Sequence, residues 1–546
     1  MKLNNIIKTV ALSSVAWFAL SCDVDRIPET TITDPAFWNN ESDLKAAANT
    51  LYLTLPGLPE TDDTWSDDAY GTSSNDISDG SRLTPGSDGF YGDQYVVIRR
   101  ANNILEKSQR VIDAGVSQDI VDIYNAEARF FRAWSYFNLL QRYGGVPLIL
   151  KTLTENAPEL QDPKSSREEI LAVIYADLDF AASKLKAPSA MASADYGRIT
   201  ATAAMAFKSR VALFEGTRAK FYGEGDAQKH LTIAKQAAKA VMDSGEHGIF
   251  PDYFNLFQYE GEGPDNPENI IVRQYGKSIE ESIASHVTQR NLETGAANPT
   301  KALADSYVMT DGLPMDKSPL YAQPTTTVEV FNNRDPRMLA TFFKTGDDYI
   351  GTKPVFTVPD INFQRTGFAN RRYANITDWQ NSRSYIDRTV LRYAEVLLNY
   401  AEATFELDDD ISDADLNLSI NKLRSRASVS LPALTNAFVA ANTLSMRYEI
   451  RRERRVELAL EGFRYWDLIR WKIAEFELTK AVLGNKLFDD FNLTAAQKNN
   501  IDQDENGNII LQKANLRVFD AGKDYLFPFP TDQLGLNPNL EQNPKW

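Results

Sequence analysis

The sequence is poor in the residues that build metal sites and nucleophilic catalytic sites. Its 546 residues include one cysteine, Cys22, and three histidines, His230, His247 and His286. No two histidines stand at the spacing of metal ligands, and each is most simply interpreted as a structural or surface residue. Nucleophile elbows, phosphate-binding loops and metal-binding boxes are also missing from the sequence. These absences argue against a zinc site and a Ser–His or Cys–His catalytic pair, and we expect no cofactor.

Long apolar runs are missing too, apart from one close to the N-terminus. Thr9–Leu20 is an apolar run of about a dozen residues that follows Lys2 and Lys8 and precedes Ser21-Cys22. A basic start, an apolar stretch and a small residue, in this order, predict a cleaved secretory signal peptide over residues 1–21. The run is too short for a bilayer core, which a helix of about 20 residues crosses.

Cys22 stands where a lipoprotein signal peptidase cleaves and where the thiol takes a diacylglycerol. We therefore predict that Cys22 is the acylated first residue of the mature protein and anchors it to a membrane. Ala19 occupies a place where such signals usually carry leucine, so the signal is loose. The alternative is a secreted protein whose thiol stays unpaired, which is less favoured because such a thiol is a liability in an oxidising compartment.

Basic residues are outnumbered along the whole chain. There are 58 Lys and Arg against 75 Asp and Glu, which gives a net charge of −17. Removing Lys2 and Lys8 with the signal peptide leaves 56 − 75 = −19. This balance argues against nucleic acid as a partner and against attraction to anionic lipid. Among so many carboxylates some pair always fits the separation that a glycosidase needs, so their number does not indicate an enzyme.

Apolar residues at three- and four-residue spacing predict helices in two blocks. The first block contains Asp43–Leu55, Val96–Ile112, Gln118–Tyr143, Ser166–Leu185, Thr200–Phe221 and Asp226–Ser244. Ser166 and Glu169 form a capping-box pattern at the start of one of these helices. Helices of this length joined by short turns indicate stacked hairpins of the tetratricopeptide kind, although no strict 34-residue period is present.

The second helical block covers residues 390–479. A helix over Leu444–Glu461 carries the run Arg451–Arg455, in which charges such as Glu449 and Arg452 fall on neighbouring turns. An ion-paired helical face is favoured over a cluster of arginines that grips a ligand.

Between these blocks the chain is rich in loops. Pro56–Gly92 combines Asp, Ser, Gly and Pro with a few aromatic residues, and residues 244–299 and 311–387 have the same character. Aromatic residues scattered through the two later stretches include Tyr275, Tyr321, Trp379 and Tyr385. Long loops without regular structure inside a compact domain are usually functional or disordered.

Five segments occur in the order that is typical of one protein family. They are ARFFRAWSYFNLLQRYGGVPLI (128–149), SYVMTDG with RDPR (306–312 and 334–337), LRYAEVLLNYAEA (391–403), ERRVELALEGFRYWDLIRW (453–471) and YLFPFPTDQLGLNPNLEQNP (525–544). Behind a lipoprotein signal, this set resembles the SusD/RagB family of outer-membrane nutrient-binding lipoproteins of the Bacteroidota. The resemblance covers essentially all of the mature sequence.

The resemblance implies a mainly α fold, in which paired tetratricopeptide-like hairpins form a scaffold and long loops with a few short strands form a ligand face. It predicts one compact unit after the signal peptide. The N-terminal helical half would be residues 22–243, with a ligand loop at 56–92. The C-terminal half would be residues 244–546, with loops at 244–387, helices at 390–479 and an extended C-terminal tail.

The same resemblance predicts a surface lipoprotein of the outer membrane that faces the cell exterior. Such a protein captures oligosaccharides or polysaccharides and delivers them to a SusC-type TonB-dependent transporter, without catalysis. A peptide-binding lipoprotein of the RagB kind is the alternative, and a loop-built glycoside hydrolase is less favoured. The acidic net charge suits neutral glycans or basic peptides better than polyanions.

Sugar recognition in water uses flat aromatic faces together with planar polar side chains. In the family the segment before the second helix contributes to the ligand site, and Pro56–Gly92 has that mixture. The predicted ligand contacts are Trp65, Asp67, Tyr70, Asn75, Asp76, Asp79, Arg82 and Tyr91, with Trp379 and Tyr385 as second candidates supported by loop position alone. Packing onto the scaffold is the alternative for the aromatic residues, and it is favoured for Tyr91 beside the helix start.

One segment follows the first half of a calcium-binding loop. Asp502, Asp504 and Asn506 occupy the spacing of EF-hand ligands, but the twelfth position, usually glutamate, is Lys513. A hairpin turn around Glu505–Asn508 is favoured, because Asn-Gly is a strong turn signal. We expect no metal site, with calcium at these three residues as a weak alternative.

Overall fold

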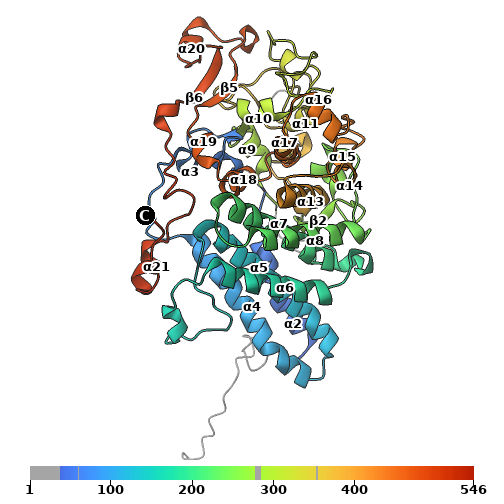
Figure 1. Ribbon diagram of the computed structural model, residues 1–546, viewed down its shortest axis with the longest axis vertical. Coiled ribbons are helices and arrows are strands. Elements are labelled where there is room, and N and C mark those ends of the chain that lie inside the picture. Colours follow the sequence, from blue (N-terminus) through green and yellow to red (C-terminus); the bar gives the residue numbers. More distant parts are fainter. Residues whose placement is uncertain (1–36, 59–60, 277–284, 352–353) are drawn as a thin grey trace, which may run out of the picture.

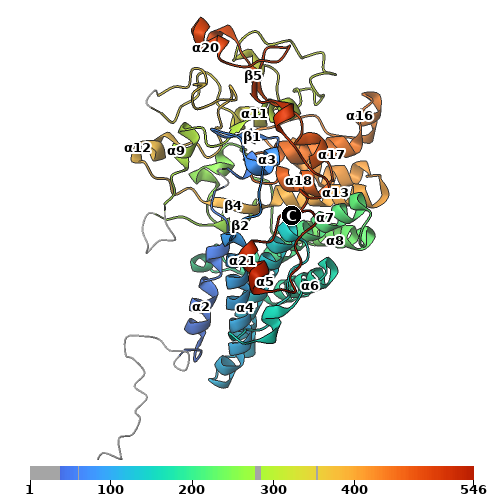
Figure 2. The same cartoon turned by 90° about the vertical axis from the view of Figure 1, so that its left-hand side faces the viewer.

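The computed structural model describes residues 37–58, 61–276, 285–351 and 354–546, so the signal peptide and Cys22 lie outside the described residues. The long helices gather at one end of the molecule, and the loops and short strands form the other (Figures 1 and 2). The N-terminal helices are α2 (Glu41–Asn49), α3 (Asp76–Asp79), α4 (Gly89–Asp113), α5 (Gln118–Tyr143), α6 (Arg167–Lys184), α7 (Ala201–Tyr222) and α8 (Ala227–Asp243).

Successive long helices pack side by side, α4 on α5, α5 on α6, α6 on α7 and α7 on α8. The stack continues into the second block, where α13 (Tyr393–Asp408) packs on α8 and α17 (Met446–Glu457) packs on α13. The other helices of this part are α14 (Asp413–Leu418), α15 (Ile420–Arg424), α16 (Asn436–Ala441), α18 (Arg464–Arg470) and α19 (Ala474–Glu477). The predicted scaffold of paired helices is therefore confirmed.

Short elements interrupt the loops at the other end of the molecule. The helices there are α9 (Thr288–Glu293), α10 (Lys301–Ser306), α11 (Pro336–Thr341), α12 (Ile376–Asn381) and α20 (Ala495–Asn499). The helix α21 (Thr531–Leu536) of the C-terminal tail lies beside the long N-terminal helices instead (Figures 1 and 2). The strands form three antiparallel pairs, β1 (Ala69–Tyr70) with β3 (Asn298–Pro299), β2 (Asn269–Arg273) with β4 (Arg388–Arg392), and β5 (Val482–Lys486) with β6 (Asn508–Gln512). Each pair fastens a loop onto a distant part of the chain, as the predicted ligand face of loops and short strands requires.

The main hydrophobic core contains side chains from both helical blocks and from the C-terminal tail. On α5, Trp134 stacks on Phe207 of α7 with ring centroids 4.6 Å apart. The tail returns to the end of α5, where Phe527 N donates to the Arg142 carbonyl at 2.7 Å and Phe529 stacks on Tyr143. The core is thus continuous across residue 243, and the boundary placed there stays a prediction. No helix in the described part of the chain has the length and apolar character to cross a bilayer.

Buried ion pairs join the segments that carry the RDPR and ERRVELALEG motifs. Glu457 is fully buried and accepts from Arg337 at 2.9 Å, Arg392 at 2.7 Å and Arg426 at 2.6 Å. Glu268, just before β2, accepts from both Arg392 and Arg426. A carboxylate buried at such a junction is tolerated because several guanidinium groups surround it.

The arginine run of α17 is ion-paired, as interpreted, but it is largely buried instead of solvated. Arg452 lies 3.4 Å from Glu449, the expected pair one turn away. Arg454 pairs with Asp467 of α18 at 2.9 Å, although Glu457 lies three residues further along its own helix. Here tertiary partners replace the neighbours on the same helix.

Candidate functional site

Segment 56–92, the predicted ligand loop, is packed onto the scaffold over most of its length. The ring of Trp65 is half-buried and lies 5.8 Å from Tyr465, 5.9 Å from Phe527 and 6.5 Å from Trp466, measured between centroids. The guanidinium of Arg142 adds a cation–π contact at 5.2 Å. These neighbours support the packing alternative for Trp65, and its contact with a ligand stays a prediction.

Asp67 is held in a buried ion-pair cluster. Its carboxylate accepts from Arg464 at 2.8 Å and from Arg455 at 2.9 Å. Burial alone would raise the pKa of Asp67, but the Arg455 and Arg464 guanidinium groups outweigh it and hold the pKa well below its usual range. These ion pairs fix the loop to α17 and α18, and contact of Asp67 with a ligand stays a prediction.

Arg82 and Tyr91 are also packed, Tyr91 as the sequence favoured, and their contact with a ligand stays a prediction. The guanidinium of Arg82 stacks on Phe527 at 4.0 Å and on Trp546 at 4.8 Å. Tyr91 is buried in the main core, with its ring 5.3 Å from that of Tyr143. Both side chains bind the C-terminal tail or α5, so the structure gives them packing roles.

The remaining predicted contacts of this segment are spread over a turn and a short helix. Tyr70 is in β1 and is buried opposite Asn298 of β3. Asn75 caps α3 by accepting from Ile77 N at 3.0 Å, and Asp76 beside it is exposed. Asp79 is buried and accepts from Ser81 and Gln512. The structure does not bring these groups into one pocket, and their contact with a ligand stays a prediction.

Trp379 lies in α12 and Tyr385 lies shortly after it, both on the loop face. The Trp379 indole donates to Glu293 at 2.8 Å, and the guanidinium of Arg290 covers its ring at 4.9 Å. The Tyr385 backbone amide donates to the hydroxyl of Tyr259 at 3.2 Å. Both predicted side chains are half-buried, so part of each ring is open to solvent, and they stay candidate contacts.

Two carboxyl groups near Tyr385 have raised pKa values. Asp387 N donates to Glu262 at 2.9 Å, and Tyr275 N donates to Asp387 at 2.7 Å. Burial, reinforced by the charge of Asp387, raises the pKa of Glu262 to about 7. Burial also raises the pKa of Asp387 to about 6. This part of the loop face is therefore less negative at neutral pH than its count of acids suggests, which suits an uncharged ligand.

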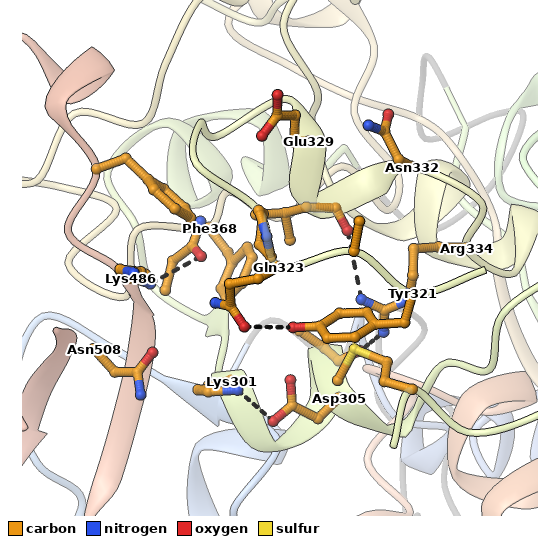
Figure 3. Close-up of a pocket in the computed structure, with 17 residues that line it drawn as sticks. Lys301, Asp305, Tyr321, Gln323, Glu329, Asn332, Arg334, Phe368, Lys486 and Asn508 are labelled. Atoms are coloured by element: carbon orange, nitrogen blue, oxygen red, sulfur yellow. Dashed lines mark hydrogen bonds and ion pairs between the residues drawn. The ribbon is translucent and has the colours of Figure 1, made fainter. Parts of the chain in front are cut away.

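A concave pocket on the loop face combines an aromatic ring with planar polar side chains (Figure 3). Its volume is about 70 Å³. The residues that line it include Lys301, Asp305, Tyr321, Gln323, Glu329, Asn332, Arg334, Phe368, Lys486 and Asn508. We call it the Tyr321 pocket. It is smaller than a typical small-molecule site, so it can hold only part of a ligand that extends beyond it.

Tyr321 forms an open edge of this pocket. Its side chain is 37% exposed, and its hydroxyl donates to Gln323 at 3.1 Å. Lys301 pairs with Asp305 at 2.6 Å across α10, as Figure 3 shows. A ring beside amide, ammonium and carboxylate groups can stack on the C–H face of a sugar and bind its hydroxyls.

The polar wall of the Tyr321 pocket could not be found from the sequence. Tyr321 was visible as one of several loop aromatics, but Asn332, Lys486 and Asn508 come from separate segments that the fold brings together. Asn508 begins β6, where its side chain also donates to Asp504 at 2.8 Å. No local pattern links these positions, so only the tertiary structure reveals them.

The segment around Asp504 is a turn, as favoured. Gln503 pairs with Ile509 across it, and Gly507 adopts a φ of +80°. The Asp504 carboxylate accepts from the backbone amides of Asn506 and Asn508, while Asp502 pairs with Lys513 at 2.8 Å. In the described part of the chain no group of three or more His, Cys, Asp or Glu side chains could hold a metal ion.

Two family models match this chain. The model described as the SusD family matches residues 273–546. The model described as "Starch-binding associating with outer membrane" matches residues 61–213. Together they cover α4–α6, most of α7, the second helical block and most of the loop face.

Individual relatives support the same assignment. A SusD-like protein of Bacteroides ovatus is 25% identical over 504 residues, which are 85% of this chain and 82% of that protein. A crystal structure of a SusD-like carbohydrate-binding protein from Bacteroides fragilis has a TM-score of 0.75 and 26% identity, and the match covers 92% of this chain and all of that one. A second crystal structure, solved with a xylogluco-oligosaccharide, shares the fold with a TM-score of 0.64. Its identity to this chain is 20%, and the match covers 91% of this chain and 97% of that one.

The helical scaffold, the ordered motifs and these matches agree over nearly the whole described chain. The chain belongs to the SusD family.

Proposed function

We propose that this protein is a cell-surface lipoprotein that binds glycans and delivers them to a SusC-type TonB-dependent transporter of the outer membrane. The observation that carries the proposal is the likeness to the Bacteroides fragilis carbohydrate-binding protein, which extends over 92% of this chain. The description of the model that matches residues 61–213 supports association with the outer membrane. Relatives named for binding also support a protein that captures its ligand without cleaving it.

We propose the Tyr321 pocket as the main candidate for the glycan-binding site. Tyr321 is an exposed aromatic side chain in a concave pocket of the loop face, and its neighbours can donate and accept hydrogen bonds. Trp379 and Tyr385 are the second candidates, because part of each ring reaches solvent beside the less negative carboxyl pair. A polysaccharide that contacts both regions would gain affinity from several weak subsites.

Calorimetric titration of the purified protein with neutral polysaccharides, acidic polysaccharides and peptides tests the function. We expect saturable binding of a neutral glycan. Tyr321→Ala should weaken it by about 1 kcal/mol, because a stacked ring contributes roughly that much. Tyr321→Phe keeps the ring and should stay closer to the wild type. Tyr448→Ala removes a tyrosine that is exposed on α17 outside the pocket, and it should leave the affinity unchanged.

Three results would contradict parts of this proposal. Binding of peptides without glycans would favour the RagB-like alternative. An unchanged affinity in Tyr321→Ala, with a loss in Trp379→Ala, would move the site to the second region. Release of shorter products from a polysaccharide after long incubation would show a glycoside hydrolase.

The lipid anchor is tested separately. We propose that Cys22 is acylated after cleavage of residues 1–21, since several acyl chains hold a protein stably on a membrane. Cys22→Ala should therefore release the protein from the membrane fraction of cells. If the variant still sediments with the outer membrane, the anchor is elsewhere.

A further inference from the structure

A large concave surface lies on the helical scaffold, away from the loop face. It is a groove of about 1260 Å³ between α4, the segment Pro147–Gln161 and the tail residues Gln533–Leu540. Figure 1 shows that segment and α21 on the same side of α4. We call it the α4 groove. Its α4 wall runs from Gly92 to Lys107, which corresponds to about 22 Å of helix.

Hydrogen bonds fix the segment opposite α4 at its first end. The hydroxyl of Tyr95 donates to the Pro147 carbonyl at 2.8 Å. Asn102 donates to the carbonyls of Ile149 at 3.1 Å and Lys151 at 3.2 Å. Because the segment is anchored directly to α4, the width of the groove at this end is set before any partner arrives.

The second end of the segment is tied to the C-terminal tail. Gln161 donates to the Leu536 carbonyl at 3.0 Å, and Asn537 donates to the Asp162 carbonyl at 2.8 Å. Asn539 donates to the Gln161 carbonyl at 2.7 Å. The groove is therefore a preformed part of the fold and not a gap beside a loose loop.

Apolar side chains on three walls of the groove face solvent. Val96 of α4 is 47% exposed, Leu160 of the opposite segment 44%, and Leu536 of α21 69%. Single exposed apolar residues are ordinary, but three that line one preformed groove point to an interaction site. These three residues come from distant parts of the sequence, and the fold brings them to one concavity.

The charge of the groove is opposite to that of the protein. Its lining includes four cations and two anions, and Lys151 forms an ion pair with Glu159. Arg99, Arg100 and Lys107 then stand against Glu155 alone, in a chain whose net charge is −17. Arg99 and Arg100 are exposed, and Lys107 lies two turns further along the same helix. A basic strip beside an apolar floor attracts an acidic amphipathic partner.

From these features we propose that the α4 groove binds an acidic, amphipathic helix of a partner protein. A helix of about 15 residues has the length of the α4 wall and a diameter of about 10 Å with its side chains. Its apolar face would cover Val96, Leu160 and Leu536, and its acidic side chains would meet Arg99, Arg100 and Lys107. Recognition of an amphipathic helix in a groove of this kind is a recurring mode of protein–protein binding.

The distribution of the cations favours a protein segment over a lipid. A lipid carries its charge at one end of an apolar chain. Arg99 and Lys107 are eight residues apart, about 12 Å along the helix, so the positive charge follows the groove instead of closing one end. A helix with acidic residues on successive turns matches such a strip.

Photo-crosslinking in cells tests whether a partner protein occupies the α4 groove. A benzophenone amino acid placed at Val96 or Leu536 of the full-length protein should crosslink to one partner protein. Mass spectrometry of the joined peptides should place both crosslinks in the same acidic, amphipathic segment. The same probe at Leu516, which is 63% exposed outside the groove, should give no such product. Crosslinks only to lipid, to a second copy of this chain or to nothing would overturn the proposal.

Fluorescence anisotropy with a synthetic peptide of the crosslinked sequence tests whether the basic residues of α4 contribute to binding. Arg99→Glu should weaken its binding, and Arg99→Glu with Arg100→Glu should weaken it at least tenfold. Lys186→Glu with Lys422→Glu makes the same charge change on exposed lysines elsewhere and should leave the affinity within about twofold. Because Arg100 also donates to the Thr50 carbonyl, thermal melting must show that the variants fold. Equal losses of peptide affinity in the two double variants would overturn the proposal. An unchanged glycan affinity in the Arg99→Glu, Arg100→Glu variant would show that the groove is distinct from the glycan site.

Discussion

Asp63 carries a carboxyl group that the fold buries almost completely. Its side chain is on the packed part of segment 56–92, is 2% exposed and accepts from Gly462 N at 2.9 Å. Burial raises the pKa of Asp63 to about 8, and the nearby charge of Asp68 adds to the effect. The carboxyl is thus mostly protonated at neutral pH. Its neutral form lets the loop approach the turn after α17 without burying another charge.

We expect Asp63 to make the protein less stable as the pH rises. Unfolded aspartate has a pKa of about 3.9, so between that pH and about 8 the folded state keeps a proton that the unfolded state has lost. Each pH unit in this window then lowers the free energy of unfolding by about 1.4 kcal/mol. Asp63→Asn keeps the acceptor oxygen and removes the titration, so the variant should exceed the wild type in stability at pH 8.

Urea unfolding at pH 5, 6.5 and 8 measures this difference. The exposed neighbour provides a matched control, since Asp62→Asn makes the same chemical change outside the buried site. If the difference between Asp63→Asn and the wild type is the same at all three pH values, Asp63 does not hold its proton in the folded state.

Residue roles in segment 56–92 show the limit of sequence reasoning. The mixture of Trp65, Tyr70 and acidic residues fits a sugar site, but the same residue types also fasten a loop to a scaffold. The partners that hold Asp67 in the structure are Arg455 and Arg464, which lie almost 400 positions away in the chain. Whether such a residue contacts a ligand or fastens the loop depends on partners that are distant in the chain, and a single sequence does not reveal which residues those partners are.

At the scale of elements the sequence was far more informative. The helix predicted over Gln118–Tyr143 has the same bounds in the structure, because its broad apolar stripe ends at Gly144. By contrast, α4 begins at Gly89, seven residues before the predicted start, since Asp88 caps it by accepting from Phe90 N. Within the predicted second helical block, the chain breaks at Ser419, where α14 ends and α15 begins. Periodicity thus predicts the helix, while single side chains set where it starts and breaks.

The capping box of α6 gives an element-scale prediction. Ser166 accepts from Glu169 N at 3.3 Å, and the Glu169 carboxylate accepts from Ser166 N at 2.8 Å. Ser166→Ala removes the side-chain cap and should lower the free energy of unfolding by about 1 kcal/mol. Ser165→Ala, one residue earlier and outside the cap, should change it by no more than a few tenths. Equal effects of the two substitutions in urea unfolding would contradict the role of the cap.

At the scale of the whole molecule, the buried ion pairs decide how distant segments meet. Glu457 lies at the end of α17 and joins Arg337, Arg392 and Arg426, which belong to α11, β4 and the turn after α15. Arg337, Arg392 and Glu457 belong to three of the five segments that carry the family resemblance, so the fold brings these three segments together at one junction.

Removing one charge from this junction should destabilise the whole protein. Glu457→Gln keeps the shape but leaves three buried guanidinium groups short of a partner, and we expect a loss of about 3–5 kcal/mol in the free energy of unfolding. Asp243→Asn breaks the exposed pair with Lys239, 2.6 Å apart on α8, and should cost no more than about 0.5 kcal/mol. Similar losses in the two variants would show that the junction does not hold the segments together.

The pH dependence of stability in the wild type and in Glu457→Gln separates the effect of the charge of Glu457 from that of its shape. Burial alone would raise the pKa of Glu457, but Arg426, Arg392 and Arg337 outweigh it and hold the pKa well below its usual range. The stabilisation is then present above the pKa of an unfolded glutamate, about 4.3, and is lost as the pH falls below it. Wild-type stability should therefore drop between pH 5 and pH 3 more steeply than that of Glu457→Gln, in which this group cannot titrate. Parallel losses of the two proteins over that range would mean that acid unfolding starts at other carboxylates, and that the junction holds by packing instead of charge.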